Sequence, residues 1–169
     1  MSFANAKIIG DAVQAARDRA GLAATNAYRK MGDTFHERLK DRRFTEKHAK
    51  EAGYLPRAGE SFDRASKEFK QSYLGRKLKL KGHTRPLEFS GKTRQSTETH
   101  RVDAVSGILT DGDGGEVQVK YPQARGLNRK SKFTDINMRD EFLRTTKAER
   151  KTLADVFEKA LQDELRKGN

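Results

Sequence analysis

The strongest constraint on the fold is a regular helical stripe in the first forty residues. Small or apolar side chains recur in steps of three and four between Ala4 and about Lys40, which places them on one face of an α-helix. They are Ile9, Val13, Ala16, Ala20, Ala23, Ala27, Met31, Phe35 and Leu39. We expect one long helix, or two in line with a kink at Gly21 or Gly32, because glycine weakens a helix by about 1 kcal/mol relative to alanine. The stripe packs either against the same domain or against another subunit.

The next forty residues alternate between loop and regular structure. Residues 44–60 mix charges with glycines and Pro56, and this composition predicts a loop. A second helix is predicted from Ser61 to about Leu74, ended by Gly75. Between Arg76 and Thr84, lysines alternate with leucines, so we expect a strand or an extended arm with its cations on one side.

A β-hairpin is predicted between Ser96 and Tyr121. Alternating apolar residues form two strands, and the sequence Asp111-Gly112-Asp113-Gly114-Gly115 between them supplies the residues that a tight reversal requires. Pro122 closes the second strand, and a basic loop follows over 123–135.

The last element is predicted to be an amphipathic helix. Thr146 to Glu149 matches a capping box, in which a threonine oxygen and a glutamate carboxylate satisfy free backbone N–H groups. The apolar face that follows consists of Leu153, Phe157, Ala160, Leu161 and Leu165. Together these elements predict an α+β fold.

Length and composition favour one domain with a thin core. The chain has 169 residues, of which 34% are hydrophobic and 36% charged. We expect a single domain over 1–169, divided into a helical region (1–42), a basic linker with one helix (43–95) and the hairpin with the last helix (96–169). The chain has no cysteine, hence no disulfide. Neither a signal peptide nor a membrane span is expected, since no long apolar run occurs.

The formal net charge of +12 favours anionic partners, namely nucleic acid, an acidic protein surface or anionic lipid, and does not choose among them. The segment from Arg43 to Ser96 has few apolar residues, a composition that suits a surface better than a core. The residues predicted to face a partner or DNA are Arg43, Arg57, Arg76, Lys77, Lys79, Lys81, Arg85, Arg94, Arg129 and Lys130. A simply solvated amphipathic face is the alternative interpretation.

No pattern in the chain predicts catalysis, a metal site or a cofactor. His36 and Glu37 lack the second histidine one turn later that a zinc-hydrolase helix needs. The aspartates of the hairpin turn lack the glutamate that completes a calcium loop, because Pro122 stands there. Ser90 has no nucleophile elbow around it. We therefore expect a binding protein and no enzyme.

Several short motifs, in order, resemble the virion-morphogenesis or tail-completion proteins of tailed bacteriophages. The resemblance runs from about residue 28 to the end of the chain. Its motifs are Arg43-Phe44, Tyr54 with Pro56-Arg57, Ser61-Phe62, Lys77, Pro86-Leu87-Glu88, Ser90 to Arg94, Ser96, Asp140 to Leu143 and the helix after Thr146.

The resemblance implies a non-enzymatic protein of the virion neck, assembled in the host cytoplasm. It implies a homo-oligomeric ring, a hexamer or dodecamer, that joins tail to head and contacts portal, adaptor, tail-terminator or tail-tube proteins. Lysines and arginines in such a ring would also meet the DNA backbone. The alternative from another class is an accessory protein that binds DNA or RNA without sequence specificity, and a phage enzyme such as a nuclease has the least support.

Overall fold

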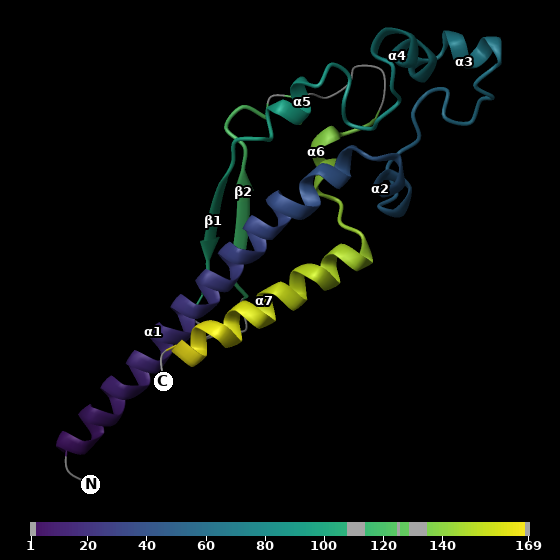
Figure 1. Cartoon of the computed structure of the whole chain (residues 1–169). Helices are drawn as coiled ribbons and strands as arrows, with labels where there is room; N and C mark the ends of the chain where they lie inside the picture. Colours follow the sequence, from purple (N-terminus) through teal and green to yellow (C-terminus); the bar gives the residue numbers. More distant parts are fainter. Residues whose placement is uncertain (1–2, 108–113, 125, 129–134, 168–169) are drawn as a thin grey trace. The chain divides into compact units, whose positions relative to one another are not determined.

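The computed structural model describes residues 3–107, 114–124, 126–128 and 135–167, and for 3–9 only the backbone. The fold is mixed α and β, which confirms the predicted α+β class (Figure 1). Its helices are α1 (Phe3–Thr34), α2 (Glu46–Glu51), α3 (Lys67–Gln71), α4 (Tyr73–Lys81), α5 (Lys92–Gln95), α6 (Met138–Leu143) and α7 (Lys147–Lys167). A π-helical turn η1 (Phe35–Leu39) and a 3-10 turn η2 (Lys40–Phe44) extend α1, and the strands are β1 (Arg101–Val105) and β2 (Glu116–Lys120).

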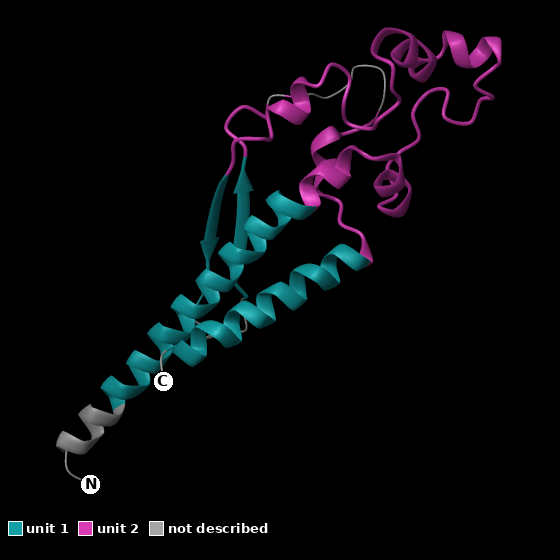
Figure 2. Ribbon diagram, in the orientation of Figure 1, with its two compact units in different colours: residues 1–38, 101–120, 148–169 teal, residues 39–100, 121–147 magenta. Residues whose placement is uncertain are grey.

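The chain divides into two compact units that are interleaved along the sequence (Figure 2). Unit 1 comprises residues 1–38, 101–120 and 148–169, and unit 2 comprises residues 39–100 and 121–147. The units therefore do not follow the three consecutive regions expected from the sequence. The expectation of a single domain stays a prediction.

Unit 1 is built on the long helix α1, with the hairpin packed against it (Figure 1). α1 continues through Gly21 and Gly32, so the predicted kink or break is absent there. At Gly32 the glycine is explained by close packing: a Cβ on this residue would lie 2.5 Å from Val102 Cγ1 and 2.9 Å from Val117 Cγ2. Gly32 thus lets both strands approach the helix.

The antiparallel hairpin is confirmed, and it is shorter than predicted. β1 and β2 pair from Arg101 with Lys120 to Val105 with Glu116. Thr97 and Thr99, expected in the first strand, precede it. Most of the predicted turn, residues 111–113, lies outside the described residues.

The C-terminal helix is also confirmed, as α7 begins at Lys147 directly after Thr146. Asn26 Nδ2 donates to Glu164 Oε2 at 3.0 Å, and the rings of Tyr28 and Phe157 lie 4.6 Å apart between centroids. These contacts join α7 to α1 within unit 1.

Unit 2 contains most of the buried apolar side chains. Of the ten buried hydrophobic residues described, two alanines lie in unit 1 and eight larger residues lie in unit 2. The eight are Leu39, Phe44, Tyr54, Phe69, Leu74, Leu87, Leu127 and Phe142. The expectation that residues 43–96 are poor in core was therefore wrong, because five of these eight come from that segment.

The strand or extended arm predicted over 76–84 was wrong, since most of that segment belongs to helix α4. Ser72 caps the N-terminus by accepting a hydrogen bond from Gly75 N–H at 3.1 Å, and Gly82 ends the helix with a φ of 71°. Gly75 does not stop a helix; it lies within α4, where a Cβ would come within 1.9 Å of the Phe69 carbonyl oxygen. Its missing side chain lets α4 start against the end of α3.

The other helix boundaries in unit 2 also differ from the prediction. Ser66, and not Ser61, caps the helix that contains Phe69, and it accepts from Phe69 N–H at 3.0 Å. The predicted loop at 44–60 contains the short helix α2, whose cap Thr45 accepts from His48 N–H at 3.2 Å. Local hydroxyl caps thus define several short helices where longer patterns were expected.

Candidate functional site

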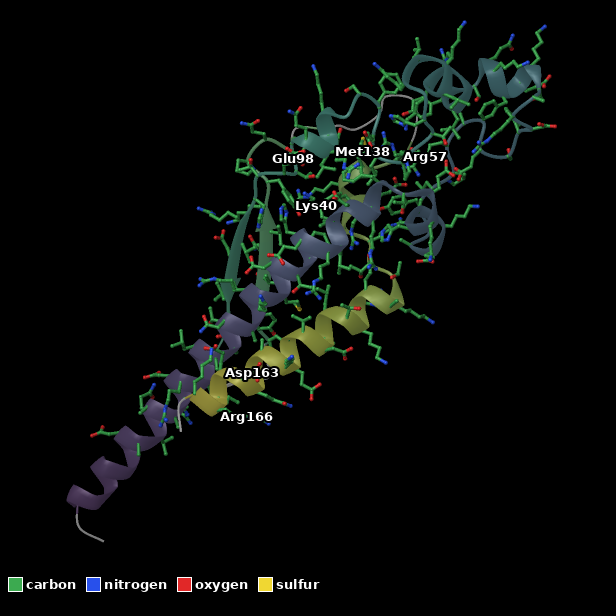
Figure 3. All side chains as sticks on the ribbon, in the orientation of Figure 1. Lys40, Arg57, Glu98, Met138, Asp163 and Arg166 are labelled. Atoms are coloured by element: carbon green, nitrogen blue, oxygen red, sulfur yellow. The ribbon has the colours of Figure 1, made fainter. Side chains whose placement is uncertain are left out.

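Arg57 and Glu141 form an ion pair inside unit 2. Arg57 donates from Nη2 to Glu141 Oε2, and the two side chains are 13% and 2% exposed. Glu141 Oε1 also accepts from Leu55 N–H at 2.9 Å. The carboxylate therefore joins α6 to the turn around Pro56, and Arg57 (labelled in Figure 3) serves this structural contact.

Arg43 is fully buried in unit 2. Its Nη1 donates to the Leu39 carbonyl at 3.0 Å, and its Nε donates to the Phe142 carbonyl at 3.3 Å. The neighbouring Phe44 ring lies 6.0 Å from the Phe142 ring. The prediction that Arg43 faces a partner was wrong, because its guanidinium satisfies carbonyl groups in the core.

Lys77 is also buried, and its surroundings weaken its charge. Its Nζ donates to the Arg85 carbonyl and lies 5.7 Å from the Tyr73 ring centroid. Burial and the positive charges of Arg57 and Arg85 lower the pKa of Lys77 to about 8, although Glu88 acts in the opposite direction. The prediction that Lys77 lies on the surface was wrong as well, since the residue is 2% exposed.

Three of the predicted site residues are exposed cations of α4. Arg76, Lys79 and Lys81 are exposed, as is Leu80 between them. Because an α-helix turns about 100° per residue, Arg76, Lys79 and Leu80 share one side of α4, which we call the α4 face, whereas Lys81 lies about 140° around the helix from Arg76. In Figure 3, nitrogen-tipped side chains project from the α3 and α4 segment. Among the described residues, no ion pair involves Arg76, Lys79 or Lys81.

Two partly exposed aromatic rings lie beside the α4 face. Tyr73 and Phe89 are stacked, with centroids 6.2 Å apart and an interplanar angle of 29°. Lys77 Nζ lies over the Tyr73 ring and Lys81 Nζ lies 5.6 Å from the Phe89 centroid. Each ring therefore makes a cation–π contact with a lysine ammonium group.

The remaining predicted site residues are dispersed. Arg85 lies 3.5 Å from the buried carboxylate of Glu88, measured from Nε to Oε2. Arg94 pairs with Asp41 at 3.4 Å and lies over the Phe44 ring. Arg129 and Lys130 lie outside the described residues. Of the ten predicted residues, Arg76, Lys79 and Lys81 are exposed on α4, and the structure brings Arg76 and Lys79 to one side of that helix.

Sequence reasoning missed the buried polar residues that organise unit 2. Glu141, Glu88 and Thr97 are 1%, 6% and 0% exposed. Thr97 Oγ1 donates to the Arg94 carbonyl at 2.8 Å, and its own carbonyl accepts from Lys40 Nζ at 3.2 Å. For Glu141, the sequence offered one indication, which is that the residue lies next to Phe142 in the motif Asp140 to Leu143.

The described residues contain no cluster of three or more histidine, aspartate or glutamate side chains arranged to hold a metal ion. No helix in the described part of the chain is long and apolar enough to cross a bilayer. An open hollow of about 500 Å³ in unit 1 is lined by Ala16, Arg19, Leu22, Ala23, Glu164, Leu165 and Lys167.

Comparison with known proteins adds no relative: no family model, no curated protein and no solved structure matches the chain.

Proposed function

We propose that the protein is a structural subunit of a tailed-phage virion, a tail-completion or neck protein that joins tail to head-connector as part of a ring. The observation that carries the proposal is where the motif residues lie. Several of the most informative motif positions are interior: Arg43, Phe44, Tyr54, Leu87 and Glu88 are all at most 9% exposed. Motifs that are distant in sequence contribute to one core, as expected if the pattern encodes a shared fold.

The Pro86–Gly91 segment supports the same proposal through its backbone. Leu87 adopts a left-handed conformation with a φ of 54°, which costs a non-glycine residue about 1 kcal/mol or more. Its side chain is nevertheless 4% exposed, so burial in the core offsets this cost. Gly91, with a φ of 82°, then starts α5. The left-handed backbone at Leu87 and Gly91 therefore gives a structural reason for the Pro-Leu and Ser-Gly motifs, because this segment must fold in that way.

Unit 1 supports assembly with further copies of the chain. Val13, Leu22, Val105 and Leu165 are 46%, 63%, 67% and 46% exposed. In the described residues, β1 and β2 pair with each other, so each strand keeps one open edge. A two-stranded sheet is marginal by itself, and open edges accept further strands. Neighbouring copies in a ring would cover these surfaces.

Localisation in the particle tests the proposal directly. Immunogold labelling of purified virions, or a cryo-EM map of them, should place the protein at the junction between capsid and tail. Particles made without the protein should accumulate as separate heads and tails. Labelling elsewhere, or normal joining of heads and tails in its absence, would contradict the proposal.

The ring itself is tested by light scattering of the protein, alone and co-expressed with portal, adaptor or tail-tube proteins. Leu22→Gln, on unit 1, should reduce the assembled fraction. The matched variant Leu143→Gln, at an exposed position of unit 2 (58%), should leave it unchanged. Equal assembly by both variants would exclude unit 1 as the contact between copies.

A further inference from the structure

Three exposed apolar side chains of unit 2 come from helix α4 and the segment that follows it. They are Tyr73, Leu80 and Phe89, which we call the apolar patch. The other large apolar side chains that the described part of unit 2 exposes come from separate segments, at Leu55, Phe62 and Leu143. Single exposed apolar residues are ordinary on a protein surface, whereas a contiguous group of them marks a site of interaction.

Helical geometry places two members of the apolar patch on one side of α4. Because an α-helix turns about 100° per residue, Leu80 lies about 20° around the helix from Tyr73. Arg76 lies about 40° around the helix from Leu80, one turn earlier in the chain. Leu80 and Tyr73 therefore share their side of the helix with one exposed guanidinium group.

Phe89 contacts both ends of the same helix. Its ring stacks on the ring of Tyr73 in the first turn of α4. The Nζ atom of Lys81, the last residue of α4, lies 5.6 Å from the centroid of the Phe89 ring. These two contacts hold the Phe89 ring against α4, so the apolar patch is formed before any partner binds.

Positive charge surrounds the apolar patch. From Gln71 to Leu87 the sequence contains five lysines and arginines and no aspartate or glutamate. The carboxylates that approach this segment are engaged: Glu88 is buried and pairs with Arg85, and Glu46 accepts a hydrogen bond from Thr84. A partner with carboxylates around an apolar side chain would complement both the patch and its charge.

The contacts of the two rings favour a protein partner over lipid or nucleic acid. Lysine ammonium groups lie over both rings, so the rings cannot enter the acyl region of a membrane without carrying charge with them. Because the rings also stack on each other, they are not free to stack on unpaired bases. Protein interfaces, in contrast, are enriched in tyrosine, phenylalanine and arginine and have a polar rim.

We propose that the apolar patch is a docking site for an acidic segment of another protein. An apolar side chain of that segment packs against Leu80 and the Tyr73–Phe89 pair, and its carboxylates pair with Arg76 and Lys81. This inference does not rest on the proposed function, because it concerns a surface of unit 2 in the isolated protein and requires neither a ring nor a virion.

The test is fluorescence anisotropy with two labelled peptides of about 12 residues and equal net charge. In the first peptide, single leucines alternate with pairs of glutamates, and in the second peptide serine replaces each leucine. The wild-type protein should bind the leucine peptide about tenfold more tightly than the serine peptide, because only the leucine peptide buries apolar surface on the patch.

Variants locate the binding site. Leu80→Ser should weaken binding of the leucine peptide about tenfold and change binding of the serine peptide less than about twofold. Leu143→Ser is the matched control, because Leu143 is 58% exposed and Leu80 is 66% exposed, and it should change neither affinity. Arg76→Gln should weaken binding of both peptides about threefold and reduce its salt dependence. Circular dichroism checks that each variant keeps its helices.

Several results would overturn the inference. They are equal binding of the two peptides, equal losses in Leu80→Ser and Leu143→Ser, and no binding of the leucine peptide at about 1 mM. Phosphatidylserine vesicles or a DNA duplex could bind more tightly than the leucine peptide and depend on Leu80, which would assign the patch to lipid or nucleic acid. Self-association that Leu80→Ser abolishes, measured by analytical ultracentrifugation, would identify a second copy of the chain as the occupant.

Discussion

The two units of this protein differ in how many of their hydrophobic side chains they bury. Unit 2 combines eight buried hydrophobic residues with buried charged groups that are satisfied internally, as in the Arg57–Glu141 pair. Unit 1 has two buried alanines, a two-stranded hairpin and helices that carry several exposed apolar side chains, such as Val13, Leu22 and Leu165. The comparison indicates that unit 2 is stabilised from within, whereas unit 1 leaves more of its apolar side chains exposed.

The largest expected effect concerns the buried ion pair of unit 2. Glu141→Gln keeps the size of the side chain but leaves Arg57 without its charge partner, so the free energy of unfolding should fall by about 3 kcal/mol. Urea denaturation measures this change. Adding Arg57→Met should cost less than the two single losses together, and a Glu141→Gln protein within 0.5 kcal/mol of the wild type would refute the role of the pair.

The next effect is a pH dependence of stability that comes from Lys77. Its pKa is about 8 in the folded protein and 10.5 ordinarily. Between these values the unfolded chain binds a proton that the folded chain does not, so the free energy of unfolding should rise with pH, by on the order of 2 kcal/mol. Lys77→Met should abolish this rise.

The measurement requires denaturation curves of the wild type and Lys77→Met between about pH 7.5 and pH 10.5, because this range spans the folded and the ordinary pKa of Lys77. The difference between the proteins cancels the titration of other lysines. A constant difference across this range would show that Lys77 keeps an ordinary pKa.

Two glycines of the same helix test the packing of unit 1. Gly32→Ala places a Cβ against Val102 and Val117 and should destabilise by about 2 kcal/mol. Gly10→Ala meets no atom within 4 Å and should stabilise by about 0.5–1 kcal/mol through helix propensity. Thermal unfolding followed by circular dichroism compares them, and effects of the same sign would mean that the hairpin does not pack closely on α1.

The smallest expected effect isolates one hydrogen bond of unit 1. Tyr28 Oη accepts from Gly115 N–H at 3.0 Å, and Tyr28→Phe removes this bond while keeping the ring contact with Phe157. The free energy of unfolding should fall by about 1 kcal/mol. Tyr73→Phe, at a more exposed ring of unit 2, is the control and should change stability by less than 0.5 kcal/mol. Equal losses of stability in the two variants would show that the Tyr28 hydroxyl contributes no more than the Tyr73 hydroxyl.

The elements with strong local signals could be predicted from the sequence. The long stripe that ends at Leu39 and the apolar face of α7 repeat over many turns, so their helices were identified correctly. The alternation of Val117 and Val119 similarly identified β2. Periodicity over long segments is the most reliable signal because burial of one face reinforces it at every turn.

Unit 2 was harder to predict because its short helices depend on caps and tertiary packing. In α4, lysines and leucines alternate as in a strand, but the Ser72 cap and the close approach at Gly75 favour a helix. The wrong secondary structure also explains why only some of the predicted surface cations are exposed. A strand would have put Lys77, Lys79 and Lys81 on one side, whereas the helix buries Lys77 and exposes the other two with Arg76.

The interleaving of the chain limits how the molecule can be divided. The backbone passes between the units at four places, after residues 38, 100, 120 and 147. No single cleavage can release one unit intact from the other, because unit 1 contributes residues on both sides of every such cut. The shortest continuous stretch that holds all of unit 2, residues 39–147, also carries the hairpin without the helices it accompanies. A truncated version of unit 2 would therefore need residues 101–120 replaced by a short connection.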